Sequence, residues 1–180
     1  MRGSAAGMEN MMRALSIALL GSLAVSGCAY TRCEFTGVTP REVGAAVGHV
    51  GCYAIDRIFI VKSYKKVWSK QFTEQLAEGR GGRTEWSVSE ASFFAFSKNS
   101  DDIRLSRTEQ GNRLLEIRCE KREMAIPFFL PPPGADRNED RERAIVQHAY
   151  WRLKQTRPEV TAKAKGEWQP AEKPPATQPN

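Results

Sequence analysis

The chain has 180 residues, of which 41% are hydrophobic and 27% charged, so it is long enough for one domain with its own core. Its mean hydropathy of -0.50 excludes several membrane spans, and its apolar content excludes disorder along the whole length. The net charge of +6 fits an anionic partner, but basic and acidic residues are interspersed, as in 136–143, and we expect no nucleic-acid role.

Residues 1–27 have the organisation of an export signal. Arg13 supplies a positive charge, and residues 14–25 form an uncharged, mainly apolar run of twelve residues. A membrane-spanning helix needs about 20 residues, so this run is typical of a cleaved signal peptide. The alternative translation starts are Met8, Met11 and Met12. The sequence therefore predicts export from the cytoplasm.

A four-residue motif, Val25-Ser26-Gly27-Cys28, closes the apolar run. An aliphatic residue, two small residues and a cysteine in this position resemble the lipobox of bacterial lipoproteins. The resemblance covers only residues 13–28. It implies a diacylglycerol on the Cys28 thiol, cleavage between Gly27 and Cys28, and an acyl chain such as palmitate on the new amino group. An ordinary secretory signal that contains a cysteine is the alternative interpretation.

The lipid would anchor the chain to a bacterial membrane. Each buried methylene contributes about 0.8 kcal/mol, so two or three acyl chains hold a protein almost irreversibly. By the same resemblance, Ala29 stands where an aspartate would favour the inner membrane, which implies the outer membrane, facing the periplasm. We expect residues 28–38 to be a lipidated tether, of which ten residues reach at most about 35 Å. The domain then stays close to the bilayer.

A helix is predicted to open the domain, which we place at residues 39–156. Thr39 is a good N-cap, Pro40 suits the first helical position, and Glu42 completes a capping box. Apolar residues then recur on one helical face, namely Val43, Val47, Val50 and Ala54. Three glycines weaken this helix, and we expect them to mark a close approach to a neighbouring element; they are Gly44, Gly48 and Gly51.

Strands are predicted in the middle of the chain. Residues 58–61 with Tyr64 indicate a buried strand, 65–84 is ambiguous, and the glycines of 79–83 indicate a hairpin or a mobile connection. Three successive strands are expected at 86–96, 103–108 and 113–119, the last two joined by a turn at 109–112. Residues 124–130 contain Pro127 and are expected to form an edge strand.

A second helix is predicted from Asp136 or Asn138 to Lys154, with acidic residues in its first turn. Residues 157–180 are rich in proline and lysine and are expected to be a disordered tail. The predicted fold class is therefore α+β, a three- to four-stranded mainly antiparallel sheet packed by an N-terminal and a C-terminal helix.

The cysteines and histidines offer little chemistry. Export makes a disulfide plausible among the three cysteines that remain after lipidation, Cys33, Cys52 and Cys119, with the pairing left open. Their spacing does not suit zinc, and we expect neither a metal nor another cofactor. The two histidines, His49 and His148, fall in predicted helices and are interpreted as surface or interface residues rather than catalysts.

Three functions remain, in this order. The first is a non-enzymatic domain that binds another envelope protein or envelope component. The second is a carrier or sensor of a lipidic or small ligand, using an aromatic cluster that comprises Trp86, Phe93, Phe94, Phe96, Phe128 and Phe129. The third is an envelope hydrolase, although no Gly-x-Ser-x-Gly motif and no distinctive carboxylate pair is present.

Overall fold

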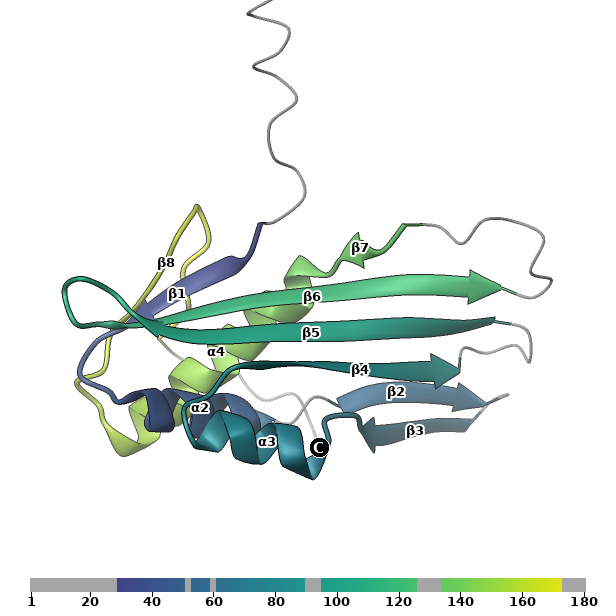
Figure 1. Ribbon diagram of the computed structural model, residues 1–180, viewed down its shortest axis with the longest axis horizontal. Helices are drawn as coiled ribbons and strands as arrows, with labels where there is room; N and C mark the ends of the chain where they lie inside the picture. Colours follow the sequence, from purple (N-terminus) through teal and green to yellow (C-terminus); the bar gives the residue numbers. More distant parts are fainter. Residues whose placement is uncertain (1–28, 51–52, 59–60, 90–94, 126–133, 173–180) are drawn as a thin grey trace, which may run out of the picture.

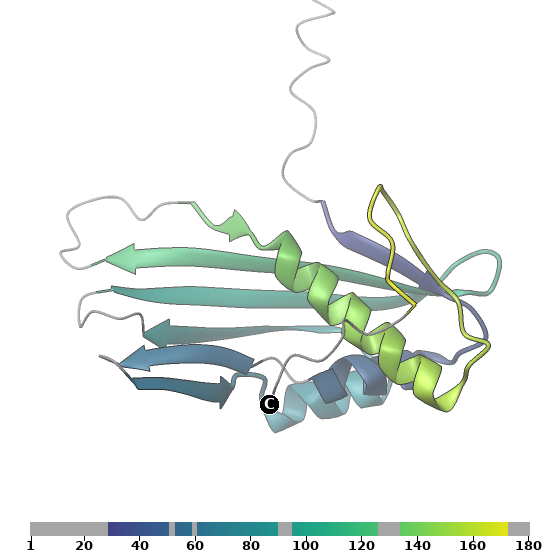
Figure 2. The ribbon, with the colours of Figure 1, turned by 180° about the vertical axis from the view of Figure 1, so that it is seen from behind.

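The fold has two layers. The computed structural model describes residues 29–50, 53–58, 61–89, 95–125 and 134–172. In this part of the chain, helices lie on one face of an antiparallel sheet, which the views from the two sides show (Figures 1 and 2). The predicted α+β class and mainly antiparallel sheet are confirmed. The main sheet has six strands rather than three or four, for reasons given below.

The main sheet combines strands from both ends of the chain. Its order is β4-β5-β6-β1-β8, and β7 pairs with β6 beside β1. The six strands are β1 (Thr31–Phe35), β4 (Gly82–Ser89), β5 (Ala95–Arg107), β6 (Arg113–Ala125), β7 (Asp136–Arg137) and β8 (Ala162–Ala164). Every pairing among them is antiparallel.

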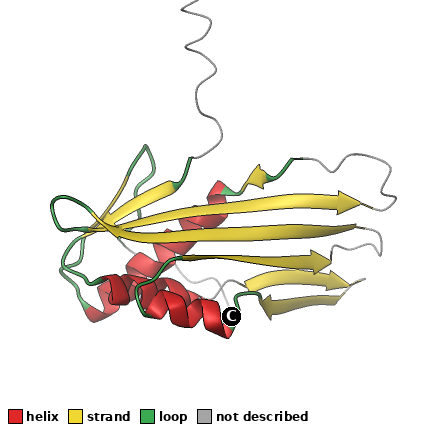
Figure 3. Cartoon of the chain, viewed as in Figure 1, coloured by secondary structure: helices red, strands yellow, loops and turns green. Residues whose placement is uncertain are grey.

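The β5–β6 hairpin is the longest element of the sheet (Figure 3). The predicted turn at 109–112 is confirmed, since Thr108 N–H donates to the carbonyl of Asn112 at 2.9 Å. Gly111 has φ +84°, a left-handed conformation that favours glycine. β5 begins before the strand predicted at 103–108 and β6 ends after the one predicted at 113–119, because the alternation of apolar and polar residues stops before the pairing does. The single strand predicted at 86–96 was wrong, since residues 86–89 belong to β4 and residues 95 and 96 begin β5.

The single buried strand predicted around residues 58–61 was wrong. Ile58 ends β2 (Tyr53–Ile58) and Val61 begins β3 (Val61–Lys66), so these residues flank the reversal of a second hairpin. β-Branched residues favour extended backbone but do not show where the chain reverses. This hairpin lies beside β4 (Figures 1 and 2).

The ambiguous segment 65–84 contains a short helix, α3 (Lys70–Ala77), capped by the Ser69 hydroxyl, which accepts from Phe72 N–H at 3.1 Å. The glycines of 79–83 lead from this helix into β4. Of the two expectations, a hairpin or a mobile connection, the hairpin is wrong, and the segment is a connection.

The first predicted helix is α2 (Pro40–Val50), and its capping box is present. Glu42 accepts from Thr39 N–H at 2.7 Å, while Glu42 N–H donates to the Thr39 hydroxyl at 3.2 Å. A Cβ at Gly44 would lie 1.7 Å from the carbonyl oxygen of Leu76, so the close approach expected here is to α3. Two residues assigned to this helix from the sequence do not belong to its described part: Gly51 lies outside the described residues, and Ala54 belongs to β2.

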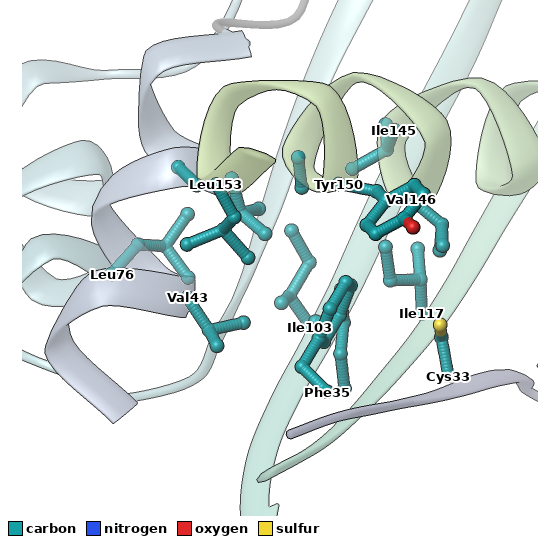
Figure 4. Packing of buried hydrophobic residues seen from close by; sticks show 14 of the residues in the cluster. Cys33, Phe35, Val43, Leu76, Ile103, Ile117, Ile145, Val146, Tyr150 and Leu153 are labelled. Carbon is teal, nitrogen blue, oxygen red and sulfur yellow. The ribbon is translucent and has the colours of Figure 1, made fainter. Parts of the chain in front are cut away.

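The second predicted helix is α4 (Glu139–Thr156), which crosses the sheet diagonally in front of β5 and β6 in the view of Figure 2. Asn138 is its N-cap and accepts from Arg141 N–H at 3.1 Å. The core lies between the helices and this sheet face (Figure 4). Its largest fully buried apolar side chains are Phe35, Val43, Val47, Leu76, Ile103, Leu115, Ile117, Ile145, Val146 and Val160.

Two predicted boundaries were wrong. Residues 31–35 lie in β1, between β6 and β8, so the tether expected at 28–38 does not reach residue 38. Residues 157–172 are likewise ordered, with β8 paired to β1 and Val160 fully buried. β1 and β8 are short, and their pairing partners lie far away in the sequence. The local composition therefore did not indicate that these segments are strands. Residues 173–180 lie outside the described residues, as does most of the edge strand predicted at 124–130.

Candidate functional site

The first candidate site is the junction where the chain enters the fold. Only Ala29 and Tyr30 separate Cys28 from β1. Cys28 and Gly27, the residues of the predicted lipidation and cleavage, lie outside the described residues. The three Cα–Cα steps from Cys28 to Thr31 span at most about 11 Å, so a group attached to Cys28 would stay within about that distance of the sheet.

A buried carboxylate fixes this junction. β1 and β7 pair with β6 on either side of Cys119, and Glu142 of α4 fills the interval between them by accepting from Cys119 N–H at 2.9 Å. The Thr31 hydroxyl donates to the same carboxylate at 2.6 Å, and the Arg137 guanidinium at 2.6 Å. Arg137 also donates to the Thr31 hydroxyl at 3.1 Å. The first residue of β1 is thereby tied to the first turn of α4.

The Glu142 cluster, which we define as Glu142, Arg137, Thr31 and Cys119 N–H, is a satisfied buried ion pair. Glu142 is 0% exposed and its oxygens have donors from three elements of the fold. Hydrogen bonding to Glu142 raises the pKa of Arg137, against the effect of burial. Removing one partner of such a pair leaves an uncompensated buried charge, which costs about 3–5 kcal/mol.

A second buried carboxylate lies on the same sheet face. Asp101 of β5 is 0% exposed and accepts from the Trp68 indole at 2.7 Å and from Arg141 at 2.9 and 3.1 Å. The Arg141 guanidinium also lies 4.5 Å from the centre of the Trp86 ring, a cation–π contact. These contacts connect α4 to β5, β4 and the segment before α3.

The buried thiols are poor nucleophiles. Burial, followed by the Glu34 carboxylate, raises the pKa of Cys33 to about 12. Burial also raises the pKa of Cys119, with further contributions from Asp101 that outweigh the opposing effect of Arg141. The thiolate is the reactive form of cysteine, so both groups stay inert near neutral pH.

The predicted disulfide does not join Cys33 to Cys119, since both thiols are free. Cys33 pairs with Leu115 in the β1–β6 register, four residues from Cys119, so the two cysteines lie about 13 Å apart along the sheet. A disulfide needs a Cα separation under about 7 Å. Cys52 lies outside the described residues, and its pairing stays a prediction.

The opposite face of the sheet carries a charged hollow next to the junction. Tyr30 lies across this face, where its hydroxyl donates to Asp102 at 2.6 Å and its ring lies 4.5 Å from the Arg104 guanidinium. Burial and the hydrogen bond to Asp102 raise the pKa of Tyr30, which keeps the hydroxyl protonated. The hollow measures about 280 Å³, and Arg83 and Arg118 also line it.

Both histidines line one cleft on the helix side. His49, at the end of α2, and His148, in α4, are exposed, as predicted for surface residues. The cleft measures about 690 Å³ and includes Trp151, whose ring packs edge-on against His148 with the centroids 5.3 Å apart. The Trp151 indole donates to the carbonyl of Ala171 at 2.9 Å, so the C-terminal segment borders this cleft.

The predicted aromatic pocket is not assembled from the residues that are described. Trp86 and Phe96 project from opposite faces of the sheet, because Trp86 pairs with Asn99 in β5 and Phe96 is an odd number of residues away from Asn99. The remaining members lie outside the described residues; they are Phe93, Phe94, Phe128 and Phe129.

Sequence reasoning missed the two buried carboxylates, although each left a signal. Asp101 shares its strand face with Ile103, and Glu142 shares its helix face with Ile145 and Val146, so both acids occupy core positions in the local periodicity. Buried acids are rare unless paired. Their arginine partners, however, follow only from the tertiary fold.

The described residues form neither a metal cluster nor a membrane-spanning helix. They contain no group of three or more histidine, cysteine or acidic side chains placed to hold a metal ion. None of the helices they form is long and apolar enough to cross a membrane. Comparisons of the chain with protein-family models, with curated proteins and with solved structures found no match in any of the three.

Proposed function

We propose that the chain is a bacterial envelope lipoprotein, anchored through Cys28 and carrying a non-enzymatic domain that binds another envelope component. The observation that carries this proposal is the motif Val25-Ser26-Gly27-Cys28 at the end of an apolar run. In the structure, β1 starts at Thr31, three residues after Cys28. An anchor there would hold the domain against the bilayer instead of displaying it on a long tether. For a Gram-negative host we place the protein at the outer membrane, facing the periplasm.

The junction suits a load-bearing anchor. β1 is hydrogen-bonded to β6 on one side and to β8 on the other, so tension on the lipid would pass into an internal strand. The Glu142 cluster adds a charge-assisted connection from Thr31 to α4, and such bonds are about twice as strong as neutral ones. Sheet and helix would therefore move together with the anchor.

The state of the reactive groups supports a binding role over catalysis. The buried carboxylates of Asp101 and Glu142 each have an arginine partner, and burial suppresses the thiolates of Cys33 and Cys119. Catalytic acids and nucleophiles need groups poised to exchange protons near working pH. These four groups instead stabilise the fold.

Intact mass and membrane fractionation test the anchor. In a bacterial host, the wild-type chain is expected to begin at Cys28, to carry diacylglycerol and an acyl chain, and to sediment with membranes. Cys28→Ser removes the thiol and should abolish both the added mass and the membrane attachment. Ser26→Ala is the matched control, because a small residue is retained at that position and lipidation should persist. A wild-type chain cleaved without added lipid would overturn the proposal.

A second candidate function is a sensor of small ligands, favoured by the cleft that holds both histidines. Its volume of about 690 Å³ lies within the range of small-molecule sites. Trp151 supplies an aromatic face, and Arg152 and Lys154 supply positive charge, so an aromatic anion is the best-suited ligand. A panel of aromatic carboxylates tests this function: a rise in melting temperature that Trp151→Ala abolishes would support it, and no rise would exclude this ligand class.

A further inference from the structure

We infer that the open face of the sheet, which the helices do not cover, rests on anionic phospholipid headgroups, an inference that builds on the proposed lipid anchor. The open face consists of the side chains that alternate with the core residues along β4, β5, β6, β1 and β8 (Figure 1). Its occupant would be a phosphatidylglycerol-rich leaflet. Its centre would be the hollow, which three arginines, two acidic residues and two hydroxyl side chains line: Arg83, Arg104, Arg118, Asp102, Glu120, Tyr30 and Ser100.

Tyr30 brings an anchor on Cys28 within reach of this side of the sheet. Its side chain crosses from the start of β1 over to β5, where it contacts Asp102 and Arg104. Cys28 is two residues away, so its sulfur would lie within about 10 Å of the hollow. Lipid on that sulfur would bring the arginines to headgroup depth.

The charge of the open face fits an anionic leaflet. By the strand register it carries seven basic residues, Arg32, Arg83, Lys98, Arg104, Arg118, Arg122 and Lys163. An eighth, Lys165, follows β8 and pairs with Glu34 of this face at 3.8 Å. The face carries five acidic residues, Glu34, Glu85, Asp102, Glu116 and Glu120, which leaves a net charge of +3. The rest of the described chain is nearly balanced, with 16 basic and 14 acidic residues.

The interaction energy is modest, so the anchor is essential to it. A basic residue near an anionic membrane contributes about 1 kcal/mol, so a net +3 favours the face-down orientation by a factor on the order of 100. This attraction would hardly retain a free protein, but an anchored chain needs only to choose its orientation. It should weaken at about 1 M salt, where the Debye length falls to roughly 3 Å.

The experiment measures which face of the anchored protein is protected. The full mature lipoprotein is reconstituted into vesicles of phosphatidylcholine alone or with an equal part of phosphatidylglycerol. Ser106→Cys puts a thiol on the open face, and Ala45→Cys puts one on the exposed side of α2; both positions are exposed. Cys52 is replaced by serine, and Cys33 and Cys119 are buried, so a membrane-impermeant maleimide reports the introduced thiol.

On phosphatidylglycerol vesicles, Ser106→Cys should react about tenfold or more slowly than on phosphatidylcholine, in line with the charge attraction, and high salt should restore its rate. Ala45→Cys should change less than about twofold, since it lies on the helix layer. If phosphatidylglycerol changes the labelling rate by the same factor at both positions, on a chain whose mass proves lipidation, the inference is overturned. The anchor would still stand, and the open face would be left to a protein partner. An unlipidated chain would instead refute the proposed function.

A charge variant separates attraction from simple crowding. The triple change Lys98→Gln, Arg122→Gln and Lys163→Gln removes three exposed charges from the open face and should restore rapid labelling of Ser106→Cys. The matched control, Lys70→Gln, Arg80→Gln and Arg152→Gln, removes three exposed charges from the helix layer and should preserve protection. Circular dichroism verifies that both variants are folded. Protection that survives the first variant would refute the electrostatic docking.

Discussion

The two faces of the central sheet use similar charged residues in different ways. On the covered face, Asp101 and Glu142 are 0% exposed and each is held by an arginine and by at least one further donor. On the open face, pairs such as Arg32–Glu116 keep much of the arginine in water, with 48% of its side chain exposed. Neighbouring residues of one strand thus experience very different dielectric surroundings.

This difference assigns the two sets of charges to different tasks. Buried partners are strongly coupled because water does not screen them, so they specify the fold and the entry of the chain into it. Exposed pairs are screened and contribute about 0–1 kcal/mol to stability. The charges of the open face can therefore act on an external partner without a large effect on folding.

The largest expected effect is at the junction. Glu142→Gln removes the charge from a fully buried group with three donors and leaves Arg137 only its exposed partner Glu139, so it should lower the free energy of unfolding by about 3–5 kcal/mol, measured by urea denaturation. Glu139→Gln, on an exposed acid of the same helix turn, should cost less than about 1 kcal/mol. Equal losses of unfolding free energy in the two variants would show that buried and exposed acids contribute alike to stability.

Adjacent aspartates give a sharper test within one strand. Asp101→Asn removes the charge opposite Arg141, and we expect a loss of about 2–3 kcal/mol, since hydrogen bonds to charged groups have this value. Asp102→Asn weakens contacts with Tyr30 and Arg104 on the open face and should cost under about 1 kcal/mol. Thermal unfolding of both variants measures the difference. The reverse order of stability would contradict the assigned environments.

The buried thiol of Cys33 on the covered face should make the protein less stable at alkaline pH. The pKa of Cys33 is raised from 9.0 to about 12, so its contribution to stability is complete below pH 9 and is lost as the pH rises toward 12. Over that range the free energy of unfolding should fall by about 1.4 kcal/mol per pH unit for this thiol. Cys33→Ala should reduce the slope by that amount in urea titrations from pH 8 to about 11. An unchanged slope would mean that the thiol is not desolvated as described.

Local patterns in the sequence predicted the elements whose determinants are local. The capping box of Thr39 and Glu42 set the start of α2, and the turn around Gly111 joined the two long strands. Each depends on residues within a few positions of one another. The expectation that Gly44 marks a close approach was also right, although the sequence did not identify α3 as the neighbour.

Elements defined by distant partners were not predicted. β1 has apolar side chains only at Cys33 and Phe35 on its covered face, too few to show alternation, and its partners in β6 and β8 lie about 80 and 130 residues away. Lipidation of Cys28 stays a prediction. The Glu142 cluster combines residues from β1, β6, β7 and α4, so its assembly became visible only with the fold.

The smallest expected change in stability completes the comparison. Arg32→Gln breaks the 2.7 Å pair with Glu116 and should alter the free energy of unfolding by less than about 1 kcal/mol, because solvent screens the arginine. It also lowers the charge of the open face from +3 to +2, which should reduce protection of the Ser106→Cys label on phosphatidylglycerol vesicles by roughly fivefold. Urea denaturation and maleimide labelling of the same preparation measure both quantities. A large loss of stability without a change in labelling would show that the open face supports the fold and not the membrane contact.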